Sequence, residues 1–251
     1  KAEAFRSVVD GVWSLLPEGA WPAWFLANHD HSRVATRYDV GGTPRRAERD
    51  RQKRAERDND SGQARARVAA MMVLTLRGTP FLYQGEELGM TDAAIPPDRV
   101  IDVDGRDPER TPMQWDGSPG AGFTTGVPWL PIPEPAREVN AAAERDDPRS
   151  MLTLYRRLLR FRRGSAALRL GAYQSLEDAP DGLYAYLRTE GDERLLVALN
   201  FTGRPLSYAG RDLPRQGRLE LSTDPDRAAG GEVALQPLEV GPDEGVVIRL
   251  P

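Results

Sequence analysis

The chain has 251 residues, 39% of them hydrophobic, enough for one large domain or two modest ones with a real core. Its formal net charge of −4, from 34 basic and 38 acidic side chains, excludes a field of one sign that would attract nucleic acid or an anionic membrane. The absence of cysteine excludes disulfides and thiolate metal sites, and we predict a cytoplasmic location with neither nucleic acid nor a membrane as partner.

The first predicted element is a helix, because apolar residues recur at helical spacing from Phe5 to Leu16. This stretch opens directly with Lys1, without an initiator Met or a capping residue. We therefore expect the sequence to be truncated at its N-terminus.

Two short apolar runs, 21–28 and 79–83, read as buried strands, and a helix-period segment lies between them at 64–76. The order helix, strand, helix, strand is typical of parallel strands with crossover helices, as in a (β/α) barrel or a doubly wound sheet. The predicted fold class is therefore α/β.

A Gly/Pro-rich loop then extends from about residue 85 to 147 and ends at a helix that Asp147 should cap. Beyond Gly171 the apolar residues change to short segments separated by Gly, Pro and Asp, which predicts a small antiparallel sheet domain. We place the boundary between 164 and 171, giving domains 1–168 and 169–251. The predicted strands of this sheet domain are 183–189, 195–201, 218–222 and 245–250.

The first candidate site follows the first strand, at the strand end where parallel sheets place their reactive groups. Both histidines, His29 and His31, lie there beside Asp30 and Arg33. A carboxylate between an imidazole and a guanidinium would stay ionised and could bind sugar hydroxyls or stabilise positive charge. The alternative is that Asp30 caps the following segment and His29 satisfies a backbone group.

The second candidate, Glu86-Glu87, follows the second strand. A retaining glycosidase needs two carboxyls about 5 to 5.5 Å apart, and adjacent residues do not supply that geometry because their side chains point in different directions. We interpret both as groups that accept backbone N–H bonds within the loop.

The third candidate is the acidic stretch 102–110. Its glycine occupies the fourth position where a calcium loop needs it at the sixth, so calcium is discounted, and no metal or cofactor is predicted. Arg106 and Arg110 alternate with carboxylates there and precede Trp115, a combination suited to sugar binding through planar donors and a stacking face. The alternative is an ion-pair network that holds the loop together.

A charge run at 45–67 contains nine basic and five acidic residues without interleaved aromatics that could stack on bases. It predicts a solvated insertion, formed as an exposed helix or a disordered loop.

Together these segments resemble the alpha-amylase superfamily, glycoside hydrolase family 13, over nearly the whole chain. Within that family the stretch 110–115 (Arg-Thr-Pro-Met-Gln-Trp) is most similar to the alpha-glucosidase and oligo-1,6-glucosidase group, with trehalose synthases and sucrose isomerases as close relatives. The insertion at 45–67 is longer and more charged than this resemblance leads us to expect. The matching segments are 25–30 with Arg33, 77–90, 105–115 and 121–124.

The resemblance implies the C-terminal part of a TIM (β/α)8 barrel, strands 7 and 8, followed by a small antiparallel β-sandwich. It makes Asp30 the third conserved carboxylate, which stabilises the oxocarbenium-like transition state, and His29 its substrate-binding neighbour. Arg106 is similar to the arginine that grips the non-reducing glucose, and Arg110 lines the same loop. Glu86 and Glu87 are not the family's catalytic pair.

The function implied is retaining hydrolysis that releases glucose from the non-reducing end of alpha-glucosides such as maltose and isomalto-oligosaccharides. The family's nucleophile and general acid follow barrel strands 4 and 5, which these residues do not include, so we expect the chain alone to be inactive and unstable without the missing N-terminal half of the barrel as its partner. Trehalose synthase or sucrose isomerase-type transglucosylation is one alternative, and a non-catalytic relative acting as an interaction subunit is another.

Overall fold

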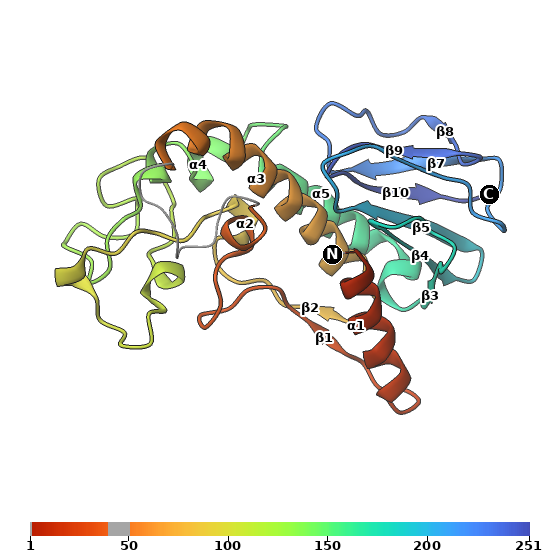
Figure 1. The fold of residues 1–251 in the computed structure, drawn as a ribbon, viewed down its shortest axis with the longest axis horizontal. Coiled ribbons are helices and arrows are strands. Elements are labelled where there is room, and N and C mark those ends of the chain that lie inside the picture. The colour runs from red at the N-terminus through yellow and green to blue at the C-terminus, as the bar shows by residue number, and fades with distance from the viewer. Residues whose placement is uncertain (1, 40–50) are drawn as a thin grey trace. The chain divides into compact units, whose positions relative to one another are not determined.

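The computed structural model describes residues 2–39 and 51–251, with the backbone alone for 51–61 (Figure 1). The chain forms two compact units. Unit 1 comprises Lys1–Trp24, Arg67–Pro80 and Arg157–Pro251, and unit 2 comprises Phe25–Ala66 and Phe81–Arg156. Among the described residues, no helix has the length and apolar character needed to cross a bilayer.

Unit 1 begins with helix α1 (Ala2–Leu15), as its apolar spacing predicts. The helix faces the sheet that follows later in the chain: the rings of Phe5 and Phe201 lie 4.9 Å apart, and Asp10 accepts a 2.7 Å hydrogen bond from the Tyr173 hydroxyl. The helix thus covers one part of the sheet within the same unit.

Two short strands, β1 (Ala23–Trp24) and β2 (Thr79–Pro80), form a parallel pair. Parallel pairing confirms the α/β order, but the prediction of two buried strands over 21–28 and 79–83 is wrong in length and burial. Phe25 and Phe81, which follow the strands, are 53% and 57% exposed. Each strand pairs only with the other in the described part of the chain, so no further strand covers their apolar side chains.

Helix α3 (Arg51–Thr75) connects to β2 and is longer than the predicted helix at 64–76. It includes much of the charge run: Arg65 is buried and donates to the backbone oxygen of Tyr38, so this end of the run is not a solvated surface. Residues 45–50, and the side chains of 51–61, lie outside the described part of the structure.

The C-terminal part of unit 1 is a six-stranded antiparallel sheet in the order β3-β4-β5-β10-β7-β8 (Figure 1). A second small sheet pairs β6 with β9. Inward residues of both sheets, such as Leu196, Ile248 and Leu238, form one buried apolar cluster. The predicted antiparallel segments are confirmed as strands. Their bounds are β3 Ala172–Ser175, β4 Leu183–Glu190, β5 Glu193–Asn200, β6 Leu206–Tyr208, β7 Gln216–Ser222, β8 Glu232–Ala234, β9 Leu238–Val240 and β10 Gly245–Arg249.

A buried arginine connects the sheet to the helices of unit 1. Arg188, on β4, has no exposed surface, and its guanidinium donates to the backbone oxygens of Thr75, Leu168 at 3.2 Å, Gly171 at 3.0 Å and Ala172 at 3.3 Å. Leu168 belongs to helix α6 (Ala166–Arg169). Desolvation by burial lowers the pKa of Arg188 to about 10, so the group remains charged near neutral pH.

Unit 2 holds mostly short elements in the long region predicted as loop. Helix α5 (Met151–Gly164) starts here, and its cap is Ser150, whose hydroxyl accepts the N–H of Thr153 at 3.0 Å. The prediction of Asp147 as the cap is wrong, because its carboxylate accepts the N–H of Arg149 and closes a turn before the helix. The other elements are α2 Val34–Arg37, η1 Glu86–Leu88, η2 Pro97–Arg99, η3 Asp107–Arg110, η4 Glu134–Arg137 and α4 Ala141–Glu144.

Candidate active site

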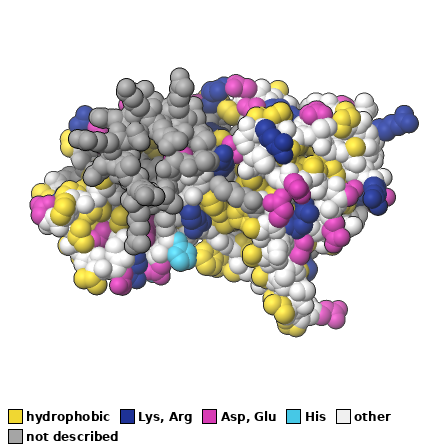
Figure 2. All heavy atoms as spheres, viewed as in Figure 1, with side chains coloured by type: hydrophobic (Ala, Val, Ile, Leu, Met, Phe, Trp, Pro, Cys, Tyr) yellow, Lys and Arg dark blue, Asp and Glu magenta, His cyan; other side chains and the backbone are white. Residues whose placement is uncertain are grey.

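A tight turn after the first parallel strand presents Asp30. The side-chain oxygen of Asn28 accepts the N–H of Asp30 at 2.9 Å, and the N–H of His31 reaches the backbone oxygen of Asn28. Both histidines lie in this turn, so the histidine atoms in Figure 2 mark its place on the surface. The Asp30 side chain is 43% exposed and makes no cap: α2 begins after Arg33 without a side-chain cap, so the capping interpretation of Asp30 is wrong.

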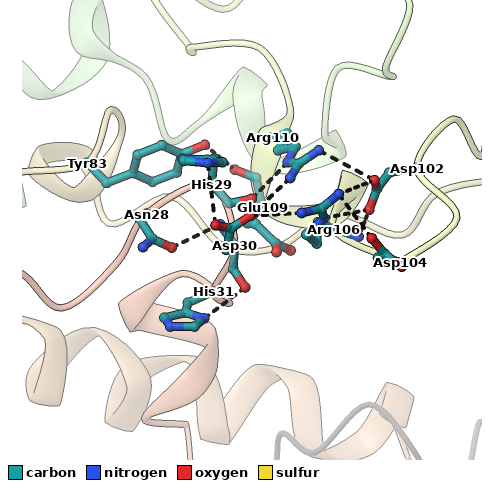
Figure 3. Close-up of polar contacts among 10 residues, drawn as sticks. All are labelled: Asn28, His29, Asp30, His31, Tyr83, Asp102, Asp104, Arg106, Glu109 and Arg110. Carbon is teal, nitrogen blue, oxygen red and sulfur yellow. Dashed lines mark hydrogen bonds and ion pairs between the residues drawn. The ribbon is translucent and has the colours of Figure 1, made fainter.

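Three of the predicted site residues surround the Asp30 carboxylate (Figure 3). The guanidinium groups of Arg106 and Arg110 reach one carboxylate oxygen at 3.1 and 3.3 Å, and the His29 ring nitrogen Nε2 lies 3.4 Å from the other. Arg110 also donates through Nε to the backbone oxygen of His29 at 2.8 Å. The fold therefore brings together residues that are about eighty positions apart.

One short helical turn, η3, carries both arginines: Arg106 immediately precedes it and Arg110 is its last residue. Both guanidinium groups contact Asp30 and Asp102. Asp107 shapes the preceding loop, since its carboxylate accepts the N–H groups of Ile101 at 2.6 Å and Asp102 at 2.9 Å. Gly105, with a φ of +76°, provides the left-handed position that this turn requires.

On the side away from Asp30, the arginines contact two further carboxylates. Asp102 accepts bonds from Arg106 Nε at 2.9 Å and Nη2 at 2.7 Å, and Asp104 lies 3.2 Å from the same guanidinium. The bonds from Arg106 hold the pKa of Asp102 well below its usual range, and the Asp102 carboxylate raises the pKa of Arg106. An ion-pair network of the kind offered as an alternative is thus present, and it includes Asp30.

The buried arginine Arg33 links the turn that contains Asp30 to the segments that follow β2. Arg33, 1% exposed, donates to the backbone oxygen of Gln84 at 2.7 Å, and its guanidinium lies 5.1 Å from the ring centre of Tyr83. Asp92 accepts the N–H of Arg33 at 2.8 Å and the hydroxyl of Ser32. The Tyr83 hydroxyl donates to the backbone oxygen of Glu109 at 3.1 Å, which ties the second strand's end to the arginine loop.

Glu86 and Glu87 have the structural role predicted for them. Glu86 accepts the N–H of Tyr83 at 2.7 Å, and Glu87 accepts the N–H of Gly85 at 2.9 Å. Desolvation by burial raises the pKa of Glu86 to about 7. Both carboxylates therefore fix the loop after β2 and are not neighbours of Asp30 in the polar network of the site.

Two further sequence predictions concern stacking and metals. Trp115 is 53% exposed and lines a cavity of about 430 Å³ with Glu87, Met113 and Arg145, and Asp30 is not among the residues that line this cavity. Across the described residues no group of three or more His, Asp or Glu side chains is arranged to hold a metal ion.

Asp92 and Tyr83 join the site in the structure but were not predicted from the sequence, whereas Asp102 belongs to the candidate stretch 102–110 without having been given a role of its own. The sequence could have indicated the ion pair between Asp102 and Arg106, because an Asp four residues before an Arg is a common ion-pair spacing. No sequence pattern indicates a site role for Asp92 or Tyr83, since their partners come from other segments and are brought near only by folding.

Comparison with known proteins agrees with the resemblance seen in the sequence. The family model described as "Alpha amylase, catalytic domain" matches residues 1–171, and the chain belongs to the alpha-amylase family. Trehalose-6-phosphate hydrolase of Bacillus subtilis (strain 168) is 30% identical over 92% of this chain and 43% of its own length. Oligo-1,6-glucosidase of Parageobacillus thermoglucosidasius is 32% identical over 76% of this chain and 36% of its own.

Solved structures of the same family superpose well. Trehalose-6-phosphate hydrolase of Bacillus licheniformis has a TM-score of 0.75 at 30% identity, over 92% of this chain and 43% of that one. An isomaltulose synthase variant from Erwinia rhapontici NX5, in complex with its natural substrate sucrose, has a TM-score of 0.77 at 31% identity, over 98% and 46%. The chain therefore spans less than half the length of these relatives.

Proposed function

We propose that this chain is part of an alpha-glucosidase that releases glucose from the non-reducing end of alpha-glucosides with retention of configuration. The main support is that two guanidinium groups and an imidazole contact one partly exposed carboxylate, that of Asp30. A carboxylate in this position can stabilise the positive charge of an oxocarbenium-like transition state. Family membership supports this interpretation.

Within this proposal each site residue has a distinct role. Asp30 stabilises the transition state and holds sugar hydroxyls, and His29 binds the same ring. Arg106 grips the non-reducing glucose with its planar N–H donors, and Arg110 lines the loop beside it. The nucleophile and the general acid would come from residues outside these 251, and the 251 residues alone are then inactive.

The proposed architecture makes β1 and β2 strands 7 and 8 of a TIM barrel. The parallel pairing of these strands supports it, and so does the location of Asp30 after the first of them. The two antiparallel sheets of unit 1 would be the C-terminal β-sandwich, with the domain boundary between residues 168 and 169.

We further propose that the substrate is an uncharged glucoside. Three carboxylates, Asp30, Asp102 and Asp104, already contact Arg106 and Arg110, which leaves the cluster with no surplus positive charge for a phosphate. A disaccharide with a phosphate on the glucose that Arg106 grips would then be a poor substrate. The two substrate classes can be compared directly in one assay.

The test uses the complete protein that contains these residues, assayed with a chromogenic alpha-glucoside, maltose, isomaltose and trehalose 6-phosphate. We expect glucose release from the uncharged substrates and a loss on the order of 100-fold or more in kcat for Asp30→Asn. Asp98→Asn, at an exposed carboxylate of the same loop region, is the matched control and should retain full activity. Absence of glucose release, or an Asp30→Asn variant as active as the parent, would refute the proposal.

A second candidate is transglucosylation, such as sucrose isomerisation. A trehalulose synthase variant in complex with Tris superposes with a TM-score of 0.80 at 31% identity, over 98% of this chain and 46% of that one. Incubation with sucrose separates the two reactions: an isomerase converts it to isomeric disaccharides, whereas a glucosidase releases free glucose.

A further inference from the structure

Asp102 contacts both arginines of the site. One of its oxygens accepts Arg106 Nη2 at 2.7 Å and lies 3.7 Å from Arg110 Nη1, and the other accepts Arg106 Nε at 2.9 Å. The second oxygen also accepts the backbone N–H of Arg106 at 2.9 Å. In Figure 3 Asp102 lies on the opposite side of the two guanidinium groups from Asp30.

The side chain of Asp102 is less exposed than that of Asp104 and makes more contacts with Arg106. The Asp102 side chain is 12% exposed, and its backbone N–H is fixed by Asp107 at 2.9 Å. Asp104 makes a single ion pair to Arg106 at 3.2 Å and is 70% exposed. An exposed single pair is worth little, whereas a bidentate pair on a fixed backbone sets the plane of the guanidinium.

This division decides which N–H groups of Arg106 remain free. Asp102 takes Nε and one N–H of Nη2, and Asp30 takes one N–H of Nη1. A guanidinium has five N–H donors, and Asp104 lies 3.2 Å from Nη2, so the second N–H of Nη1 is the donor that remains for a ligand. Without Asp102, no bidentate pair would hold the guanidinium of Arg106 in this plane.

We propose that Asp102 is a positioning residue: it restrains Arg106 and Arg110 so that they contact one oxygen of Asp30 through single bonds. The second oxygen, which faces His29, and the spare N–H groups of the arginines are then left for the substrate. This inference rests on the proposed function. It assigns Asp102 a part in catalysis through the arginines and no direct contact with the sugar.

The first test measures kcat and KM of the complete protein with a chromogenic alpha-glucoside for Asp102→Asn, Asp102→Glu and Asp104→Asn. We expect kcat/KM to fall on the order of 10- to 100-fold in Asp102→Asn, because a small misplacement of binding groups costs rates of that size. The carboxylate in Asp102→Glu should restore part of the loss. Asp104→Asn removes one exposed ion pair to the same guanidinium, so its loss of kcat/KM should be smaller than that of Asp102→Asn.

The second test does not depend on activity. Phenylglyoxal modifies accessible arginines, and mass spectrometry of the digested protein gives the modification rate at each position. Arg106 should react several-fold faster in Asp102→Asn than in the parent or in Asp104→Asn. Arg99, which donates to the backbone oxygen of Trp129 at 2.9 Å, is the internal reference, and its rate should not change unless the loop unfolds.

The two tests separate this inference from the proposed function. If the parent has no glucosidase activity, the proposed function fails, and the modification rates alone decide whether Asp102 restrains Arg106. An unchanged Arg106 rate, or equal losses of kcat/KM in Asp102→Asn and Asp104→Asn, would overturn the positioning role. A parallel rise in the rates of Arg99 and Arg106 would overturn it as well, since it would show general loosening of the loop.

Discussion

The carboxylate of Glu86 accepts the backbone N–H of Tyr83 at 2.7 Å while only 9% of the Glu86 residue is exposed. Burial raises its pKa to about 7, against about 4.3 for a glutamate in an unfolded chain. The folded protein therefore binds a proton that the unfolded chain has already released between these two values. This arrangement makes the folded state less stable as the pH rises from about 4.3 to 7.

Glu86→Gln removes this pH dependence because the amide stays neutral and its oxygen can still accept the Tyr83 N–H. Relative to the variant, the parent should lose on the order of 3 kcal/mol of unfolding free energy between pH 4.5 and 7.5. Urea midpoints at the two pH values measure this difference. Glu87→Gln is the control, since Glu87 is more exposed, and equal pH slopes for the two variants would contradict the burial argument.

Arg106→Lys keeps a positive charge near Asp30 but removes the planar fork. A lysine ammonium cannot bind Asp102 through two parallel bonds while also reaching Asp30 and a sugar hydroxyl. We expect KM for a chromogenic alpha-glucoside to rise roughly tenfold, equivalent to about 1.4 kcal/mol of binding free energy. Arg99→Lys, which changes an arginine in the same region that contacts only backbone oxygens, should leave KM near the parent value.

Arg188→Met leaves four backbone oxygens of unit 1 without their buried donor. Each buried polar group left unpaired costs about 1 to 3 kcal/mol, so the unfolding free energy should fall by roughly 4 kcal/mol or more. The measurement is a denaturant titration. Arg218→Met is the matched control on the exposed face of β7, and a loss of the same size there would argue against the buried bonds as the cause.

Ser150→Ala removes the cap of helix α5 and should lower the unfolding free energy by about 1 kcal/mol. Asp147→Ala leaves that cap in place and removes only the turn contact to Arg149, so its effect should be within about 0.5 kcal/mol. Thermal unfolding of the two variants compares the two positions. A larger loss for Asp147→Ala would mean that Asp147 is the true cap.

Patterns of local spacing predicted most of the secondary structure. The helical periods near Phe5 and Tyr155 and the antiparallel segments after Gly171 all appear in the structure. The strands near Trp24 and Pro80 were predicted too long, because an apolar run shows that burial is needed somewhere but does not show which neighbour supplies it. The cap at Ser150 was missed for a related reason: Asp147 and Ser150 are both good caps, and the exact start of a helix is decided by backbone geometry.

For the candidate site, the residue types at a strand end and in a charged loop were sufficient to select Asp30, His29, Arg106 and Arg110. Their sequence order also matched the alpha-amylase family, which the family model confirms. These selections depend on covalent neighbours and on the direction of parallel strands, both of which can be read along the chain. The sequence by itself therefore determined the family and the four residues that we propose as the site.

Only the tertiary structure decided which ion pairs those four residues form with one another. The distances that place two guanidinium groups on Asp30 join segments 76 and 80 positions apart, and Asp102 lies on the other side of these groups. It also decided the proton affinity of Glu86, because desolvation depends on everything packed around a carboxylate and not on its neighbours in the chain. Charge strength and burial are properties of three-dimensional surroundings, and sequence spacing carries no measure of either.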